Sequence, residues 1–259
     1  MAVQTSSFVK KLAANDRPTR EAALESLRKF LSNKQTSMPL LEYQKLWKGL
    51  YYSMWFCDRP RPQQRLADAL GALFSETIPA KNFGVFVDSF WFVMGKEWVG
   101  VDQHRIDKYY MLLRRVINHS FRKLQTQKWD KNFVDLYLGV MMQGPLSGDA
   151  KIPYAIPYHI IDIYIDELEK VMFADIEEEG EEKEAQIAQK KQDIIDNTPI
   201  KALLLPFERL NKNALLKTLR LKVKEDIFED DRLAEWGIVE KEEEVKDSDD
   251  ESDDEWHGF

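Results

Sequence analysis

The sequence predicts an all-α fold, an irregular HEAT-like stack of antiparallel helix pairs followed by a disordered acidic tail at its C-terminal end. Apolar residues recur at helical spacing over long segments of the 259-residue chain. Only 11 glycines and 10 prolines punctuate these segments, and the breaks between them are short, as in stacked helix pairs. Because no strict repeat is visible, an irregular bundle is the alternative architecture.

The first helices are expected between proline-containing turns. A short helix is predicted over 6–14 and another after Pro18, a residue suited to the first helical turn. The helix after Pro39 has the most regular apolar stripe. Its inward-facing residues are Tyr43, Leu46, Trp47, Leu50, Tyr51, Met54 and Trp55. It should end near Cys57, because the prolines that follow disfavour helical geometry in the residues before them.

The middle of the chain continues the helical pattern. Helices are predicted over 63–78, over 101–127, which is the longest, and over 130–143 and 153–175. Asp102 is expected to cap or to open the longest of them. The segment with Phe83, Phe86, Val87, Phe90, Trp91 and Met94 is apolar on more than one side, so it should be enclosed; a buried strand is the competing assignment.

The domain organisation follows from changes in composition. Residues 1–175 are expected to form the main helical domain, and residues 176–197 a charged linker or exposed helix. Residues 198–224 should be C-terminal helices that pack on the main domain. Residues 225–239 contain apolar islands and form a candidate docking segment. Residues 240–259 hold too little apolar surface to fold alone and are predicted to be a disordered acidic tail.

Charge is distributed unevenly along the chain. Residues 1–160 carry 23 Lys+Arg and 14 Asp+Glu, a balance of +9, and residues 161–259 carry 14 and 31, a balance of -17. A basic body with an acidic end suits a nucleic-acid particle, although the charge is equally compatible with a role in solubility alone. The single Cys57 excludes an intramolecular disulfide, and no signal peptide or membrane span is expected.

The chemistry of the sequence does not indicate an enzyme. The four histidines have no metal-ligand spacing, and no phosphate-binding loop or nucleophile elbow occurs. No metal or cofactor is therefore expected. Asp162, Asp166 and Glu169 share one helix face, which is more typical of a solvated or partner-facing acidic stripe than of an acid/base pair.

Two groups of basic residues are candidates for contact with RNA or a partner. Arg105, Lys108, Arg115 and Arg122 lie along one side of the helix over 101–127, where they suit phosphate contact or simply a solvated face. The second group is Arg59, Arg61 and Arg65, which two prolines hold in a turn and the following helix; the alternative is a plain helical corner.

The C-terminal region supplies further candidates. Ile227, Phe228 and Trp236 are candidate docking residues, for the body of the protein or for a partner. Ser248 and Ser252 each begin a Ser-Asp-Asp-Glu sequence, which fits an acidophilic kinase and makes both candidate phosphorylation sites.

Two tryptophan-rich blocks resemble a known family. They are Trp47-Lys48-Gly49-Leu50-Tyr51-Tyr52-Ser53-Met54-Trp55 with Asp58 and Pro60, and Phe90-Trp91 followed by Lys96-Glu97-Trp98-Val99-Gly100-Val101-Asp102, Arg105 and Asp107-Lys108-Tyr109-Tyr110-Met111-Leu112. Both are similar to the ribosomal RNA-processing protein 1 family, also called the nucleolar protein 52 family. The resemblance covers roughly residues 6–225 and indicates a fungal member.

The resemblance implies a nucleolar, non-catalytic assembly factor, a helical scaffold on large-subunit precursors that is required for pre-rRNA processing. The partners that it implies are the precursor particle, a Brix-domain factor with its RNA-binding partner and a WD-repeat assembly factor, with direct rRNA contact as a further expectation. The chain lacks a strong basic nuclear-import cluster. A helical-repeat protein-protein adaptor unrelated to ribosomes is the alternative, and an unrecognised enzyme is a third hypothesis.

Overall fold

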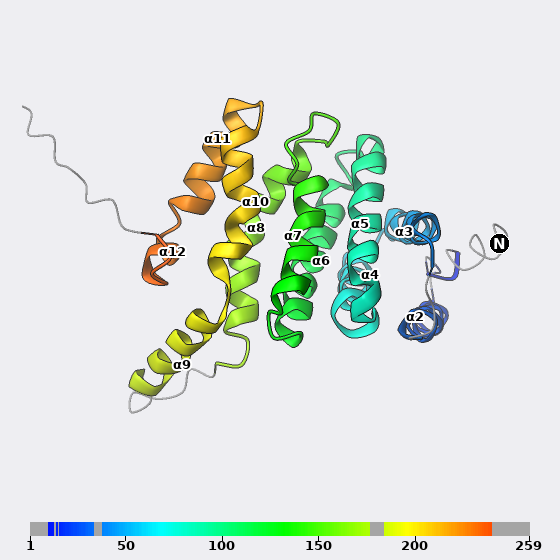
Figure 1. The fold of residues 1–259 in the computed structure, drawn as a ribbon. Coiled ribbons are helices and arrows are strands. Elements are labelled where there is room, and N and C mark those ends of the chain that lie inside the picture. Colours follow the sequence, from blue (N-terminus) through cyan, green and yellow to red (C-terminus); the bar gives the residue numbers. More distant parts are fainter. Residues whose placement is uncertain (1–9, 13, 15, 34–37, 177–183, 240–259) are drawn as a thin grey trace, which may run out of the picture.

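The all-α prediction is confirmed by a computed structural model, which describes residues 10–12, 14, 16–33, 38–176 and 184–239. Within these ranges the chain forms helices and turns and no β-strand. Figure 1 shows the helices stacked side by side, from α2 at one end to α12 at the other. The predicted tail over 240–259, with Ser248 and Ser252, lies outside the described residues, as does most of the helix predicted over 6–14.

The helices occur in the following order: α2 (Arg17–Ser32), α3 (Leu40–Trp55), α4 (Pro60–Ala72), α5 (Ala80–Glu97), α6 (Ile106–Thr126), α7 (Lys131–Gln143), α8 (Ala155–Met172), α9 (Glu184–Asn197), α10 (Ile200–Asn213), α11 (Lys217–Val223) and α12 (Asp231–Glu235). The π-helical turns η1 (Leu73–Thr77) and η4 (Lys224–Phe228) continue α4 and α11. The short 3-10 turn η2 (Trp98–Gly100) follows α5.

The helices form two layers in which alternate helices are neighbours. One layer contains α3, α5, α7 and α10, and the other contains α4 with η1, α6 and α8. Helices within a layer run parallel. On α6 and α8, for example, Tyr110 lies against His159 and Gln125 donates to the carbonyl oxygen of Val171, so contacts advance in the same direction along both helices. Alternating layers of antiparallel pairs are the arrangement of α-solenoids.

Large aromatic side chains fill the space between the layers. The Trp47 ring lies 4.9 Å from the ring of Phe90 and 5.0 Å from that of Phe86, both on α5, and 5.4 Å from that of Phe74 on η1. Further along the stack, the Tyr164 ring of α8 lies 4.5 Å from Phe207 of α10 and 4.9 Å from Phe121 of α6. The helical-spacing stripe that begins at Tyr43 therefore faces the core, as the sequence predicts.

Gly71 allows α4 and α6 to approach closely. A Cβ atom at this position would lie 2.7 Å from Cδ2 of His119 and 3.1 Å from Cβ of Arg115. The small residue thus places the arginines of α6 directly beside α4, where the basic surface described below is formed.

Two helices begin at positions other than those predicted. α4 begins at Pro60 rather than near residue 63, because proline fits the first helical turn, where the amide hydrogen has no intrahelical acceptor. α6 begins at Ile106 rather than near residue 101. Asp102 does not cap that helix; its carboxylate accepts from the amide of His104 at 3.0 Å and pairs with Arg105, which stabilises the preceding turn.

The C-terminal helices extend the stack. The hydroxyl of Tyr164 on α8 donates to the carbonyl oxygen of Leu203 on α10 at 2.8 Å. Ile227 and Trp236 are buried and Phe228 is partly buried against the core of the chain itself. The candidate docking segment over 225–239 therefore covers the end of the protein's own core. In the charged region before α10, α9 forms a helix of which only Ile195 is buried.

Candidate nucleic-acid interface

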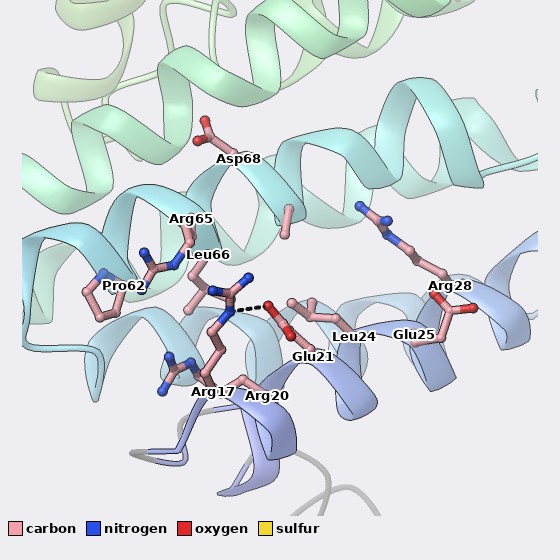
Figure 2. Close-up of a pocket in the computed structure, with 11 residues that line it drawn as sticks. Arg17, Arg20, Glu21, Leu24, Glu25, Arg28, Pro62, Arg65, Leu66 and Asp68 are labelled. Carbon is pink, nitrogen blue, oxygen red and sulfur yellow. Dashed lines mark hydrogen bonds and ion pairs between the residues drawn. The ribbon is translucent and has the colours of Figure 1, made fainter.

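A cleft of about 490 Å³ lies between α2 and α4. Arginines from both helices border it, and Figure 2 shows the side chains of Arg17 and Arg65 approaching one another across it. The floor is apolar and is formed in part by Leu24 and Leu66. The full lining is Arg17, Arg20, Glu21, Leu24, Glu25, Arg28, Pro62, Arg65, Leu66, Asp68 and Ala69.

A second depression, of about 630 Å³, adjoins the first along α4, α6 and α8. The two share Arg28, Asp68 and Ala69, so they form one continuous surface over four helices. We call this surface the basic cleft, after its seven cationic side chains, Arg17, Arg20, Arg28, Arg65, Arg115, Arg122 and Lys170, which stand against Glu21, Glu25, Asp68, Glu76 and Glu167.

The cationic groups of the basic cleft differ in how far carboxylates neutralise them. Nε of Arg115 lies 2.5 Å from a carboxylate oxygen of Asp68, and Arg17 is paired in the same way with Glu21. Arg28 reaches Glu76 only at 4.0 Å, while no carboxylate among the described residues pairs with Arg65 or Arg122. Arginine presents several donors in a plane that matches a phosphate group. Arg28, Arg65 and Arg122 are therefore the groups best placed to bind phosphate.

Only two of the four residues in the predicted basic stripe on α6 lie in the basic cleft. These are Arg115 and Arg122. Arg105 instead lies over the Trp55 ring, with its guanidinium carbon 4.6 Å from the ring centroid, and pairs with Asp102. Lys108 is only 5% exposed, so its place among the candidate phosphate contacts is wrong. It faces the neighbouring α3 and not solvent.

Of the second predicted group, Arg59 and Arg61 are exposed at the start of α4, and Arg65 lines the cleft one turn further on. Sequence reasoning missed Arg17, Arg20 and Arg28, which contribute as many guanidinium groups as α4 and α6 together. They lie on α2, 33 or more residues before Arg61, and nothing in their spacing indicates which helix they face.

Lys108 and Lys123, both on α6, have buried ammonium groups that cap the ends of earlier helices. Nζ of Lys108 donates to the carbonyl oxygens of Trp55 at 2.7 Å and Cys57 at 3.1 Å. Nζ of Lys123 donates to the carbonyl oxygen of Ile78 at 2.7 Å. The last carbonyls of a helix lack intrahelical donors and carry the negative end of its dipole, so a cation there is favourable. Desolvation lowers the pKa of both lysines.

Lys108→Met is expected to lower the free energy of unfolding by about 2 kcal/mol, because two buried carbonyls lose charge-assisted donors. Chemical denaturation monitored by circular dichroism measures the change. The matched control is Lys131→Met, since Lys131 is exposed and forms only a surface pair with Asp135; its effect should stay within about 0.5 kcal/mol. Equal stability of the two variants would contradict the capping role.

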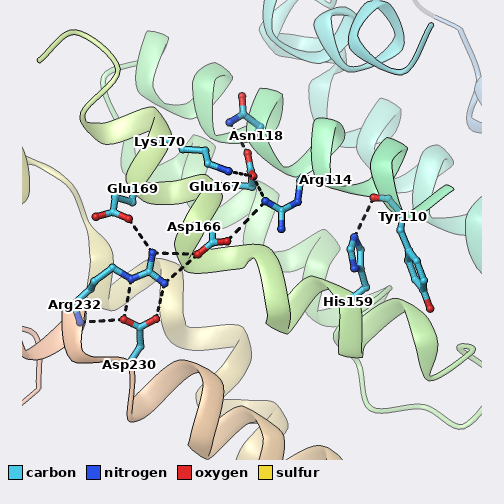
Figure 3. Close-up of polar contacts among 10 residues, drawn as sticks. All are labelled: Tyr110, Arg114, Asn118, His159, Asp166, Glu167, Glu169, Lys170, Asp230 and Arg232. Carbon is cyan, nitrogen blue, oxygen red and sulfur yellow. Dashed lines mark hydrogen bonds and ion pairs between the residues drawn. The ribbon is translucent and has the colours of Figure 1, made fainter. Parts of the chain in front are cut away.

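A polar network connects the basic cleft to α12 (Figure 3). Glu167 is 1% exposed and accepts from Arg114, Asn118 and Lys170, each at 2.8 Å. Asn118 in turn accepts from Nε of Arg122 at 2.8 Å. The buried carboxylate thus holds side chains of α6 and α8 in place along the cleft.

The acidic stripe predicted on the helix over 153–175, formed by Asp162, Asp166 and Glu169, pairs with basic residues of the chain itself. The guanidinium of Arg232 donates to Asp166 at 3.1 Å and to Glu169 at 2.8 Å, while Lys222 pairs with Asp162 at 2.5 Å. These pairs fasten the last helices to α8. The stripe is therefore an internal attachment surface for the C-terminal helices, which argues against its use as an acid/base pair.

The histidine in the basic cleft is a neutral group at physiological pH. His119 Nδ1 lies 2.7 Å from the Ser75 hydroxyl. Burial, assisted by the charges of Arg122 and Arg115, lowers the pKa of His119 to about 4. His159 on α8 has a pKa lowered by burial, and its Nε2 lies 3.0 Å from the carbonyl oxygen of Tyr110.

The described residues contain no group of histidine, cysteine and carboxylate side chains arranged to hold a metal ion. Cys57 is buried, and burial raises the pKa of its thiol, so little thiolate is available. No helix within the described ranges is long and apolar enough to span a bilayer. The chemistry that the cleft does provide is the recognition of anionic groups by arginine.

Comparisons with known proteins agree over most of the chain. The family model described as "Nucleolar protein, Nop52" matches residues 3–258. The chain is 36% identical over 168 residues to ribosomal RNA processing protein 1 homolog B of Homo sapiens, which is 63% of this chain and 22% of that protein.

Other relatives give similar values. Identity is 33% over 168 residues to homolog A of Homo sapiens, covering 63% of this chain and 36% of the relative. Identity to the Caenorhabditis elegans homolog is 32% over 164 residues, which cover 62% of this chain and 41% of that relative. The matched part of the chain thus spans less than half the length of each of these relatives.

Proposed function

Because the chain belongs to the Nop52 family of nucleolar proteins, we propose that it is a non-catalytic helical scaffold that acts in ribosomal RNA processing on precursors of the large ribosomal subunit. The names of its relatives as ribosomal RNA processing proteins support the process. The observation that carries a direct role for this chain is the basic cleft, in which arginines of α2, α4 and α6 meet on one surface.

The architecture suits a scaffold. A two-layer helical stack exposes long surfaces on both layers, while its core is filled by aromatic side chains. We propose that the basic cleft binds the phosphates of rRNA and that other faces bind protein partners of the precursor, a Brix-domain factor with its RNA-binding partner and a WD-repeat factor. A helical-repeat adaptor unrelated to ribosomes remains the rival proposal.

Charge reversal in the basic cleft tests the RNA contact. Arg65→Glu combined with Arg122→Glu should weaken binding to a fluorescein-labelled, single-stranded 20-nucleotide RNA at least tenfold at 100 mM KCl. The logarithm of the RNA-binding constant decreases with the logarithm of the salt concentration, and this dependence should become shallower by about 1.4, since two contacts to single-strand phosphates are lost. These arginines are chosen because Arg115→Glu would also place two carboxylates together at Asp68.

The matched control makes the same change of charge on the other layer. Lys201→Glu combined with Arg209→Glu alters two exposed residues of α10, away from the cleft. It should weaken RNA binding less than threefold. Equal losses in both variants would show that only net charge matters and would contradict a defined RNA site.

A cellular experiment tests the proposed role in the maturation of the large ribosomal subunit. Depletion of the protein should reduce large-subunit precursors and mature large subunits, and the wild-type chain should restore both. The cleft variant should restore them only in part. Normal levels after depletion would refute the proposed role, and affinity purification without pre-rRNA or assembly factors would favour the unrelated adaptor.

A further inference from the structure

We propose that the acidic segment 240–259 of the chain occupies the basic cleft when RNA is absent and competes with RNA for it. This inference rests on the proposed function, because it concerns the regulation of the same cleft. It follows from the charge of the segment, from the point at which the described chain ends, and from the contacts that lead from that point to the cleft.

The charges of the segment and the cleft are complementary. Residues 240–259 contain 11 acids and 2 lysines, a net charge of -9. In the cleft, Arg65 and Arg122 pair with no carboxylate among the described residues, and Arg28 has its nearest at 4.0 Å. A carboxylate, like a phosphate, can accept two parallel hydrogen bonds from one guanidinium. An acidic chain of this kind can therefore bind where RNA phosphates bind.

The last described helix, α12, is attached to α8, which borders the cleft. Arg232 of α12 is held by Asp166 and Glu169 of α8, and the ring centroids of Trp236 and Phe173 are 6.2 Å apart. Lys170, which follows Glu169 on α8, lines the cleft.

Polar contacts, most of them drawn in Figure 3, form a continuous path from α12 to the basic cleft. Asp166 contacts both Arg232 and Arg114, and Arg114 also pairs with Glu167. The path then runs through Asn118 to Arg122 in the cleft. The acidic segment therefore follows a helix that is attached to α8, the helix at one edge of the basic cleft.

The segment is long enough to follow the cleft to its far end. Twenty residues span at most about 70 Å when extended. From α8 through α6 and α4 to α2 are three helix-to-helix steps, or about 30 Å at the usual spacing. Every arginine of the cleft is thus within reach, and the tether keeps the local concentration of the segment high.

Competition of this kind would affect selectivity more than maximal affinity. An RNA that makes several simultaneous phosphate contacts displaces the segment, whereas a weak, transient contact does not. Ser248 and Ser252 lie inside the acidic run, and a phosphate on either adds a charge of about -1.5 to -2. Phosphorylation should therefore strengthen the competition.

The first experiment measures RNA binding by the full-length chain. In a tail-neutral variant, all 11 acids of residues 240–259 are replaced by Asn or Gln. It should bind the labelled 20-nucleotide RNA at least fivefold more tightly than wild type at 50 mM KCl. The gain should disappear when Arg65→Glu and Arg122→Glu are added. An affinity equal to wild type, or a gain that survives the cleft substitutions, would overturn the proposal.

The second experiment detects the contact without RNA. Fluorescence energy transfer is measured between dyes on Asp250→Cys and Gln64→Cys, in a Cys57→Ser background whose fold is checked by circular dichroism. High transfer is expected at 50 mM KCl, and low transfer at 500 mM KCl or with Arg65→Glu and Arg122→Glu present. Energy transfer that changes neither with the salt concentration nor with the cleft substitutions would overturn the proposal.

Two further outcomes separate the alternatives. Transfer between singly labelled chains in a mixture would assign the segment to a second copy and would overturn the intramolecular contact. If the cleft substitutions leave RNA binding unchanged but abolish the energy transfer, the proposed RNA site fails while the contact of the tail with the cleft stands. Failure of the two proposals is thus distinguishable.

Discussion

Replacing Trp47 by alanine is expected to lower the free energy of unfolding by about 4 kcal/mol. Trp47 is 0% exposed and is surrounded by the rings of Phe74, Phe86 and Phe90, which come from both layers. Its indole nitrogen has no hydrogen-bond partner within the described residues. The loss therefore consists of apolar burial and of the cavity left where three helical elements meet.

Urea denaturation, followed by circular dichroism, measures this loss. Trp47→Phe should cost less than Trp47→Ala, because a phenyl ring fills part of the cavity. Phe30→Ala, at a half-exposed aromatic residue on α2, is the control and should change stability by no more than about 0.5 kcal/mol. A Trp47→Ala chain as stable as the control would show that this region does not hold the layers together.

The second large effect is a loss of stability in acid that depends on His119. Its pKa in the folded protein is about 4, below the ordinary value of 6.5. Between these values the unfolded chain binds the proton and the folded chain does not, so stability is lost as the pH falls from about 6.5 to about 4 and is unaffected above 6.5. The full contribution is on the order of 3 kcal/mol.

The contribution of His119 appears as a difference between proteins, because carboxylates titrate in the same range. Stability is measured from pH 7 to pH 4 for wild type and for His119→Gln, which keeps a neutral partner for the Ser75 hydroxyl. The variant should lose less stability over this interval, and His104→Gln, at an exposed ring, should follow wild type. Parallel curves for wild type and His119→Gln would contradict the assignment. The lowered pKa of His159 acts in the same direction.

The family was accessible from the sequence because two blocks of aromatic residues are long and unusual. The match of the family model over residues 3–258 confirms that resemblance, while fungal origin stays a prediction. Structure explains why these blocks are aromatic. Trp47 lies in the core where α3, α5 and η1 meet, Trp91 of α5 is buried beside Phe90, and Trp98 packs beside Tyr109 at the turn into α6.

The sequence by itself determined the class of fold, the apolar face of most helices and the opposite charges of the two ends of the chain. These are local or additive properties: helical periodicity is repeated every few residues, and net charge is a sum. The helix that follows Pro39 shows this. Its apolar stripe from Tyr43 to Trp55 could be assigned without knowing any neighbour, and in the structure the stripe is buried except for the partly buried Leu46 and Trp55.

Only the tertiary structure decided which basic residues form a surface. Lys108 and Arg115 share one side of α6, yet Lys108 caps the end of α3 and Arg115 borders the cleft, because different elements lie opposite them. Arg28 and Arg122 are separated by 94 positions and line the same depression. Such groupings depend on how closely helices approach, as Gly71 permits for α4 and α6, and pairing between distant segments leaves no periodic pattern in the chain.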